Sequence, residues 1–457
     1  MRTVPLRPRA RNVLPIAAAL AMVLSNGIAA QTPATPTESG PNAPTLRVLQ
    51  SQRVLLDPVD GRIVPATIVI EGDRIVRVIE GLPTTLPDGL DARVAHKQSF
   101  DANTLLMPGL IDSHVHLTGN PAEPFWQAVV ETDERAAITG VRNALRTVQA
   151  GFTTVRDLGA PGGAGYALRD AIRDGDVPGP RVLSAGRMVS IIGGHGDLTG
   201  FRPEVTRAMD GGNTCTGPEQ CAEVVRTLSR AGADVIKFAA TGGVLSQQNR
   251  GLGQHFTDTE MKAIVDTAHQ LGLKVASHAH GAEGVAAAAR AGVDSIEHGT
   301  YVDEAGIRAM KASGTYLVPT LSPTIAYREN LPKGLYTAVV AAKIRVRLEA
   351  TGKNIAAARQ AGLPIAYGTD SGVSEHGRNA EEMPLMVQYG GMSPKEVVVS
   401  ATRTAAELLG LENEVGRLAP GFAADIIGVG GNPMEDLGAL QRDRIRFVMA
   451  AGRVVKD

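Results

Sequence analysis

The chain contains little cysteine, few aromatic residues and no excess of charge of one sign. Its 457 residues include 2 Cys and 1 Trp, and 4% are aromatic. Lys and Arg number 46 against 47 Asp and Glu, a formal charge of -1, so nothing indicates a nucleic-acid backbone or an anionic membrane as a partner. A hydrophobic content of 43% argues against disorder, and the length suffices for a large core without disulfide staples. The chain is therefore expected to fold as a globular protein.

The sequence also lacks an apolar run long enough to span a bilayer, which needs about 20 residues. Basic residues at the N-terminus precede a shorter apolar stretch over residues 13–24, and small residues follow it. This order predicts a signal peptide over residues 1–30, cleaved near Ala29 or Ala30, and a Pro/Thr/Ser-rich linker over 31–44. The other interpretation is a buried first helix, which Pro15 would interrupt. We therefore expect a periplasmic or secreted protein with no membrane anchor after cleavage.

The two cysteines, Cys215 and Cys221, lie six residues apart in the loop-like segment TCTGPEQC. In an oxidising compartment they could form a small local disulfide. The alternative is a pair of free thiols. Neither cysteine is expected to be catalytic.

The remaining chain shows two different sequence patterns, one at its ends and one between them. Residues 45–106 and 411–457 alternate short β-rich runs with turns, which predicts two parts of one small β-sandwich. Glu71-Gly72-Asp73 is predicted to be a hairpin turn. Between them, over residues 107–410, short apolar strands alternate with amphipathic helices, so the pattern predicts parallel strand pairing and a (β/α)8 TIM-like barrel.

The unit over residues 257–277 illustrates this pattern. Thr257 and Glu260 form a capping box, and Met261, Ile264 and Val265 are spaced as an apolar helical stripe. The helix is predicted to end before Gly272, and the next strand leads to a histidine. In this architecture the active site is assembled where the barrel strands end.

Six side chains with metal-binding chemistry stand on these predicted strands. His114 and His116 are two residues apart on an apolar strand, so both face the same side. Lys237 lies among apolar neighbours, where desolvation favours the neutral amine that can take up carbon dioxide as a carbamate. The full set provides four imidazoles, one carbamate and one carboxylate, enough for two divalent cations such as zinc: His114, His116, Lys237, His278, His298 and Asp370.

The chain resembles the metal-dependent amidohydrolase superfamily in six ordered motifs: MPGLIDSHVHL, TTVRDLG, VIKF, SHAHG, IEHG and YGTDSG. It is most similar to the branch with Xaa-Pro dipeptidase-like, imidazolonepropionase-like and ochratoxin-hydrolysing enzymes. The tail GRLAPGFAADIIGVGGNPMEDLGAL also resembles the family's return to its sandwich. The resemblance implies that His114, His116 and Asp370 hold one metal, that His278 and His298 hold the other, and that carboxylated Lys237 bridges them.

Three further residues are candidates for substrate contact. His280 is expected to contact the substrate carbonyl or support a ligand, the alternative being a solvated loop histidine. His195 follows a predicted strand in a glycine-rich segment, and it either contacts substrate or is a turn histidine held by Asp197. Val244 follows two glycines and either shapes the pocket or packs in the core.

Other residues receive a structural interpretation. Arg156 and Asp157 resemble a pair that recurs in the family, and we interpret them as a structural ion pair rather than catalysts. His96, His255 and His376 are expected to be solvated, and His269 lies in an amphipathic helix.

The resemblance implies amide hydrolysis by a metal-bridging hydroxide, with Asp370 as the proton shuttle. The expected substrates are N-acyl amino acids or dipeptides cleaved at the C-terminal residue, with ochratoxin A as a plausible accidental substrate. A homo-oligomer is expected by analogy. The alternatives are a cyclic amide or lactone hydrolase or a deaminase of the same superfamily, and a binding protein with a decayed site. Deaminases usually use one metal and no lysine ligand, so Lys237 counts against them.

Overall fold

The computed structural model describes residues 45–121, 123–248, 251–353 and 355–457. The predicted signal peptide over residues 1–30 and the linker over 31–44 lie outside the described residues.

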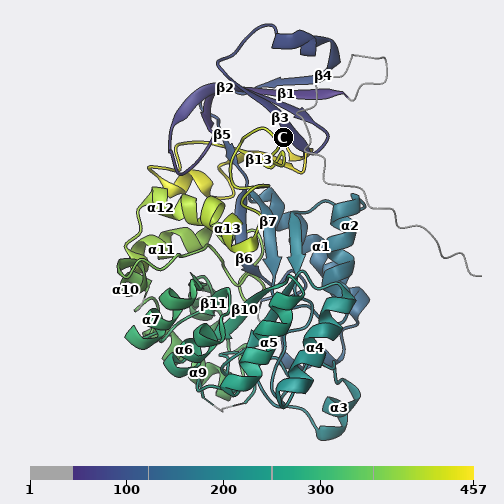
Figure 1. Cartoon of the computed structure of the whole chain (residues 1–457), viewed down its shortest axis with the longest axis vertical. Coiled ribbons are helices and arrows are strands. Elements are labelled where there is room, and N and C mark those ends of the chain that lie inside the picture. The colour runs from purple at the N-terminus through teal and green to yellow at the C-terminus, as the bar shows by residue number, and fades with distance from the viewer. Residues whose placement is uncertain (1–44, 122, 249–250, 354) are drawn as a thin grey trace, which may run out of the picture. The chain divides into compact units, whose positions relative to one another are not determined.

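Strands from both ends of the described chain lie together in one sheet (Figure 1). Their order is β15-β14-β13-β5-β1-β2-β3, with β4 paired to β1. Strand β13 runs antiparallel to β5, with Ile427 opposite Met107, and thereby joins the C-terminal strands to the N-terminal ones. The expectation that both ends build one β-structure is confirmed. The strands are β1 (Leu46–Leu55), β2 (Ile63–Glu71), β3 (Arg74–Glu80), β4 (Val94–Ser99), β5 (Leu105–Pro108), β13 (Ile426–Val429), β14 (Ile445–Ala450) and β15 (Arg453–Lys456).

Alternating apolar residues give this sheet its own core. Ile68, Ile70, Leu106 and Phe447 are at most 1% exposed and belong to one cluster. The predicted hairpin between β2 and β3 is present, and Gly72 adopts a φ of 58° that suits glycine in the tight turn.

The barrel strands form two parallel sheets, β6-β7-β8 and β9-β10-β11-β12. Two junctions close the ring. Residues 365–371 join β12 to β6, because Ile365 bridges Leu317 and Ser371 bridges Val115, and Val189, after β8, bridges Phe238 of β9. The predicted α/β barrel is confirmed. Its strands are β6 (Leu110–Val115), β7 (Phe152–Asp157), β8 (Arg181–Ser184), β9 (Val235–Ala239), β10 (Lys274–Ala279), β11 (Ser295–His298) and β12 (Tyr316–Val318).

Helices separate the strands along the chain and surround them in space (Figure 1). They are α1 (Asp133–Gln149), α2 (Ala164–Asp174), α3 (Pro203–Ala208), α4 (Pro218–Ala231), α5 (Asp258–Gln270), α6 (Ala282–Ala291), α7 (Glu304–Ser313), α8 (Pro323–Asn330), α9 (Ala338–Glu349), α10 (Ile355–Gln360), α11 (Glu382–Gly390), α12 (Pro394–Val399) and α13 (Ala405–Leu409). Short 3₁₀ segments occur at η1 (Pro87–Arg93), η2 (Phe125–Val129), η3 (Leu331–Lys333), η4 (Asn379–Glu381) and η6 (Leu437–Leu440), and η5 (Ser400–Thr404) is a π-helical turn.

Helix α5 begins as the sequence predicts. Thr257 caps the backbone N–H of Glu260, and the Glu260 carboxylate accepts the backbone N–H of Thr257. Met261, Ile264 and Val265 are buried, which confirms the apolar stripe. In the described part of the chain, no helix combines the length and apolar composition that crossing a bilayer requires.

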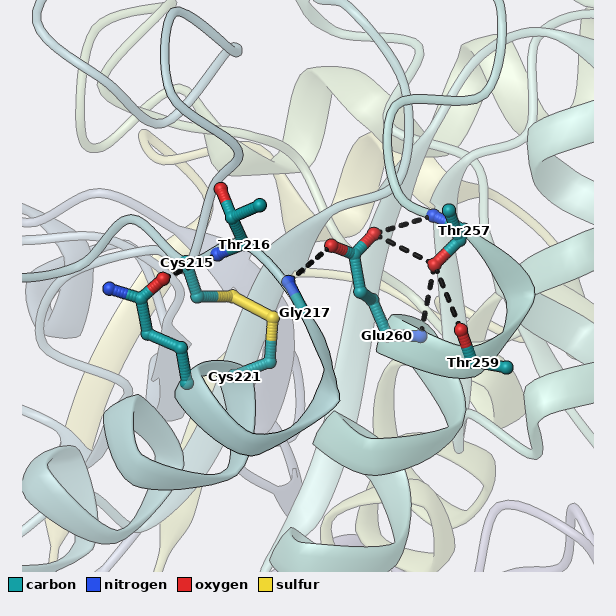
Figure 2. Close-up of a disulfide and its surroundings, with 8 residues drawn as sticks. Cys215, Thr216, Gly217, Cys221, Thr257, Thr259 and Glu260 are labelled. Carbon is teal, nitrogen blue, oxygen red and sulfur yellow. Dashed lines mark hydrogen bonds between the residues drawn. A yellow bond between two sulfur atoms is a disulfide. The ribbon is translucent and has the colours of Figure 1, made fainter.

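A disulfide joins Cys215 to Cys221 at the start of α4 (Figure 2). Its loop is also tied to α5, because the Glu260 carboxylate accepts the backbone N–H of Gly217 at 2.7 Å. Both sulfur-bearing residues are at most 1% exposed. The disulfide therefore fixes a buried junction between two barrel helices.

Opening this disulfide should destabilise the fold moderately. Because it closes a loop with a separation of six residues, the double substitution Cys215→Ser/Cys221→Ser is expected to lower the free energy of unfolding by about 2 kcal/mol. Denaturant unfolding with and without reductant measures this change. Reductant should have no effect on the double variant, and an equal unfolding midpoint for reduced and oxidised wild type would contradict the prediction.

Candidate metal centre

All six predicted ligands lie at or near the carboxyl ends of barrel strands. His114 is in β6, Lys237 in β9 and His278 in β10, while His298 is the last residue of β11. His116 follows β6, and Asp370 belongs to the closing segment 365–371. Parallel strands end at the same side of a barrel, so the topology gathers these distant residues in one place.

His114, His116 and Asp370 form the first group. The Nε2 atoms of the two histidines lie 3.4 and 3.3 Å from the same Asp370 oxygen. His116 Nδ1 donates to the Gly159 carbonyl at 3.1 Å, and His114 Nδ1 lies 2.8 Å from a Glu297 carboxylate oxygen. When these rings are neutral, both unprotonated Nε2 atoms therefore converge on a carboxylate oxygen. Two imidazole nitrogens and a carboxylate oxygen that face one another in this way can bind a divalent cation.

His278, His280 and His298 form the second group, with one ligand atom from each within 4.8 Å of the others. His298 Nδ1 is 2.6 Å from the Thr320 hydroxyl, and this hydroxyl donates to the Pro319 carbonyl. His298 therefore donates through Nδ1 and keeps the Nε2 lone pair free. The two groups are adjacent, since the rings of His114 and His298 are 5.2 Å apart.

The neutral state that metal binding requires is favoured by burial. Burial is the largest cause that lowers the pKa of His278, His280 and His298 well below the ordinary value. Burial also opposes ionisation of Asp370, but the neighbouring His114 and His116 lower its pKa overall. His116 is the exception, because against the effect of burial the neighbouring Asp370 carboxylate raises its pKa. The residue types, imidazoles and a carboxylate, fit divalent cations.

Lys237 is 1% exposed, and its Nζ has no hydrogen-bond partner among the described residues. Burial lowers the pKa of this amine to about 8. The lysine charge also contributes to the lowered pKa of His114 in the first group and His278 in the second. The buried Lys237 amine, which lies close to both ligand groups, therefore fits the role of a ligand shared by two cations.

Backbone strain is concentrated at the same place. His298, Thr320 and Asp370 have φ angles of 74°, 45° and 59°, a region that side chains other than glycine rarely occupy. Three such residues at the ends of barrel strands are typical of a functional site that the surrounding fold holds in position.

Glu297 orients the first group, and the sequence analysis did not single it out. Its carboxylate contacts His114 Nδ1 at 2.8 Å, the Arg156 guanidinium at 2.8 Å and the Ser295 hydroxyl at 2.5 Å. Burial opposes its ionisation, but Arg156 and His114 lower the pKa of Glu297 to about 2. The signal available in the sequence was an acidic residue inside an apolar strand, directly before a predicted ligand.

The ion pair predicted between Arg156 and Asp157 is wrong. Adjacent residues on a strand face opposite sides, so Arg156 points to Glu297 and Ser295 while Asp157 points elsewhere. The Asp157 carboxylate accepts the Gly159 backbone N–H at 3.3 Å, and burial raises its pKa to about 6.

Asp112 is a second carboxylate that the sequence analysis missed. It accepts hydrogen bonds from the Thr369 backbone and hydroxyl, from the Asn379 amide and from the His114 backbone. These bonds fix the segment that carries Asp370 next to the strand that carries His114. The spacing Asp112-x-His114 on one strand face was the available signal.

A cavity of about 240 Å³ opens over both groups and is lined by all six predicted ligands together with His195, Val244 and His280. His195 packs on Gly243, where a Cβ would lie 2.2–2.4 Å from the imidazole ring, and its ring is 4.2 Å from that of His278. Asp197 instead accepts the backbone N–H groups of Gly193 and Leu198. His195 therefore faces the cavity and not Asp197.

The other candidates divide clearly. His280 is 4% exposed and its Nδ1 is 2.8 Å from the Thr300 hydroxyl, so it is not a solvated loop histidine. Val244 both lines the cavity and packs in an apolar cluster. The expectation of a solvated His376 is wrong, since this residue is 3% exposed and contacts the His116 carbonyl at 3.1 Å. It is buried because the loop after Asp370 folds back over α1.

A sequence profile of the amidohydrolase family matches residues 105–455. The chain belongs to this family. Ochratoxinase from Aspergillus niger is 30% identical over 419 residues, which cover 88% of this chain and 85% of that protein.

Solved structures of similar amidohydrolases give the same fold. A crystal structure of a Xaa-Pro dipeptidase with bound methionine in the active site has a TM-score of 0.81 and 33% identity, and covers 90% of this chain and 100% of the other. A prolidase complexed with N-methylphosphonate-L-proline has a TM-score of 0.80 and 31% identity, and it also covers 90% of this chain and 100% of the other. This amidohydrolase is therefore a hydrolase of C–N bonds with candidate metal-binding clusters.

Removing the Glu297 charge should weaken metal binding. Glu297→Gln takes away the anion that orients His114 and neutralises Arg156, so the amidohydrolase should lose about 10–100-fold in metal affinity. Metal content per chain after dialysis against graded chelator concentrations measures the effect. Glu283→Gln, at an exposed position of α6, is the matched control. Equal metal retention in the two variants would contradict the role assigned to Glu297.

Proposed function

We propose that this amidohydrolase is a binuclear-metal amide hydrolase that cleaves N-acyl amino acids or dipeptides at the C-terminal residue. The observation that carries the proposal is the adjacency of the two ligand groups, with the unpartnered amine of Lys237 close to both.

In this proposal His114, His116 and Asp370 hold one cation, and His278 and His298 hold the other. Carboxylated Lys237 would be a ligand to both cations, and zinc is the expected metal. His280 belongs to the second group by distance, but its Nδ1 contact with Thr300 leaves Nε2 available for a substrate carbonyl. Metal stoichiometry and the activity of a His280 variant distinguish these two roles.

When bound, the two cations would polarise the scissile carbonyl and lower the pKa of a water molecule toward neutrality. The protein's own residues handle the protons and the charge. Asp370 takes the proton of the attacking water and delivers it to the leaving amine, so that the amine departs neutral. His280 donates to the oxyanion that develops on the carbonyl. His195, whose ring lies 4.2 Å from that of His278, contacts the substrate beside the second group.

The relatives support an amide bond to an amino acid. One similar protein is named for ochratoxin, another is a Xaa-Pro dipeptidase with methionine bound, and a third binds a phosphonate derivative of L-proline. Both ligands contain an amino-acid unit, and the methionine is bound in the active site of its dipeptidase. Ochratoxin A is accordingly one of the candidate substrates.

Export to the periplasm or the medium is part of the proposal, as is a homo-oligomeric state. The Cys215–Cys221 disulfide supports export, because such bonds persist in oxidising compartments. Fractionation of cells and the mass of the purified protein in solution test these two points separately.

Metal content and substrate range test the proposed function directly. The purified, unchelated protein is expected to contain two equivalents of divalent metal per chain, measured by elemental analysis. It should hydrolyse members of a panel of N-acyl amino acids, dipeptides and ochratoxin A, and lose this activity with chelator. Hydantoins and lactones in the same panel test the alternative chemistry. One equivalent or none, or activity on cyclic compounds alone, would contradict the proposal.

Lys237→Ala should remove the bridging ligand. We expect hydrolysis to fall by more than the roughly 100-fold that loss of a supporting residue causes, with partial recovery on addition of acetate or propionate. Lys262→Ala, at an exposed position of α5, is the matched control. Unchanged turnover of the Lys237 variant would exclude this lysine from the metal centre.

A further inference from the structure

Arg347 is a buried cation in the wall of the catalytic cavity. It lies in the last turn of α9, whose inner face also carries the buried residues Val340 and Ile344. Arg347 is 5% exposed and lines the same cavity as Asp370 and His280. The sequence offered no signal for it, because Lys343, Arg345 and Arg347 all stand in one helical segment.

The guanidinium has no acidic partner within the described residues. Its side-chain hydrogen bond is a long one, 3.4 Å from Nη1 to the Thr351 hydroxyl. Two buried carboxylates, Asp370 and Glu382, interact electrostatically with Arg347, but both make their contacts with other residues. Asp370 faces His114 and His116. Glu382 accepts the backbone N–H groups of Leu321 and Ser322 and the Ser322 hydroxyl.

Arg156 shows what a structural arginine looks like in this barrel. Arg156 is 1% exposed, and its guanidinium donates to the Ser113 carbonyl, to the Ser295 hydroxyl and to the Glu297 carboxylate at 2.6–3.2 Å. Burial of a guanidinium costs several kcal/mol unless it is paired in this way. Arg347 is nearly as buried, and among the described residues its guanidinium has no acidic partner to offset that cost.

The chemistry of the cavity defines what could pair with it. A guanidinium presents a planar fork of donors that matches a carboxylate with two parallel hydrogen bonds. Tyr327, on α8, is 4% exposed and also lines the cavity. Val244, Pro323 and Val373 supply apolar surface around this pair of donors.

We propose that Arg347, assisted by the Tyr327 hydroxyl, binds the free α-carboxylate of the substrate's C-terminal residue. The inference rests on the proposed function and narrows its substrates to amides whose leaving group is an amino acid with a free carboxylate. Arg347 thus determines specificity, because its buried charge is paired only when the leaving amino acid carries a free carboxylate. A carboxamide or ester at that position would leave the guanidinium buried and unpaired.

Matched substrates test this role. Wild-type protein is expected to hydrolyse N-acetyl-L-phenylalanine with a kcat/KM about 100-fold above that for N-acetyl-L-phenylalaninamide. Arg347→Met should lose about 100-fold on the acid and change little on the carboxamide, which removes the discrimination. Tyr327→Phe should reduce the discrimination between the acid and the carboxamide by a smaller factor than Arg347→Met. Arg345→Met, on the exposed side of the same helix, is the control and should retain full discrimination. Equal losses on both substrates in Arg347→Met would overturn the inference.

A binding measurement separates this inference from the proposed function. Calorimetry of metal-loaded protein should give L-phenylalanine at least a tenfold lower Kd than L-phenylalaninol, and Arg347→Met should equalise the two. This result would support the carboxylate site even if neither amide were hydrolysed, an outcome that would reject only the proposed reaction. Arg347→Lys keeps the charge without the fork and should give intermediate discrimination, so it replaces Arg347→Met if thermal unfolding shows that variant to be misfolded. Equal Kd values in the wild type would overturn the inference.

Discussion

The structure depends on keeping one ionised carboxylate buried among polar partners at the end of the barrel. Glu297 is fully buried, and its charge is stable there because Arg156, His114 and Ser295 all contact it. The same contacts fix the His114 ring with its Nε2 atom toward Asp370. Because strong electrostatic interactions in a low-dielectric site require precise geometry, this network makes the position of the first ligand group a consequence of the fold.

Other groups at the site are individually unfavourable for the stability of the fold. Among the residues that the structure describes, the buried Lys237 amine has no hydrogen-bond partner and Arg347 has no acidic partner, while Asp370 and His298 have strained backbones. In the proposed function, a carbamate on Lys237 and a substrate carboxylate beside Arg347 would offset the cost of burying these two groups. The concentration of such features at one end of one barrel is what distinguishes this site from an ordinary polar core.

The terminal sheet is coupled directly to the strand that begins the metal centre. Strand β5 ends at Pro108, and β6, which carries His114, starts two residues later. Gly109 makes this close connection possible, since a Cβ there would lie 2.0 Å from the Thr153 hydroxyl oxygen, and its N–H donates to the Asp425 carbonyl of the C-terminal segment. The C-terminal strands therefore help to position the entry into the barrel, although they are far from the ligands in sequence.

Local patterns in the sequence determined the secondary structure, the barrel and the six candidate ligands. Strand and helix periodicity, the Thr257 capping box and polar residues at strand ends are all readable within a few residues, because they depend on short-range geometry. Only the tertiary structure decided which side chains pair across the barrel. Arg156 contacts Glu297, 141 residues away, instead of its neighbour Asp157. His376 is buried against His116, and Arg347 lines the cavity with no acidic partner in the described part of the chain. Burial and partnership between distant strands depend on how the ring closes, and no short stretch of sequence contains that information.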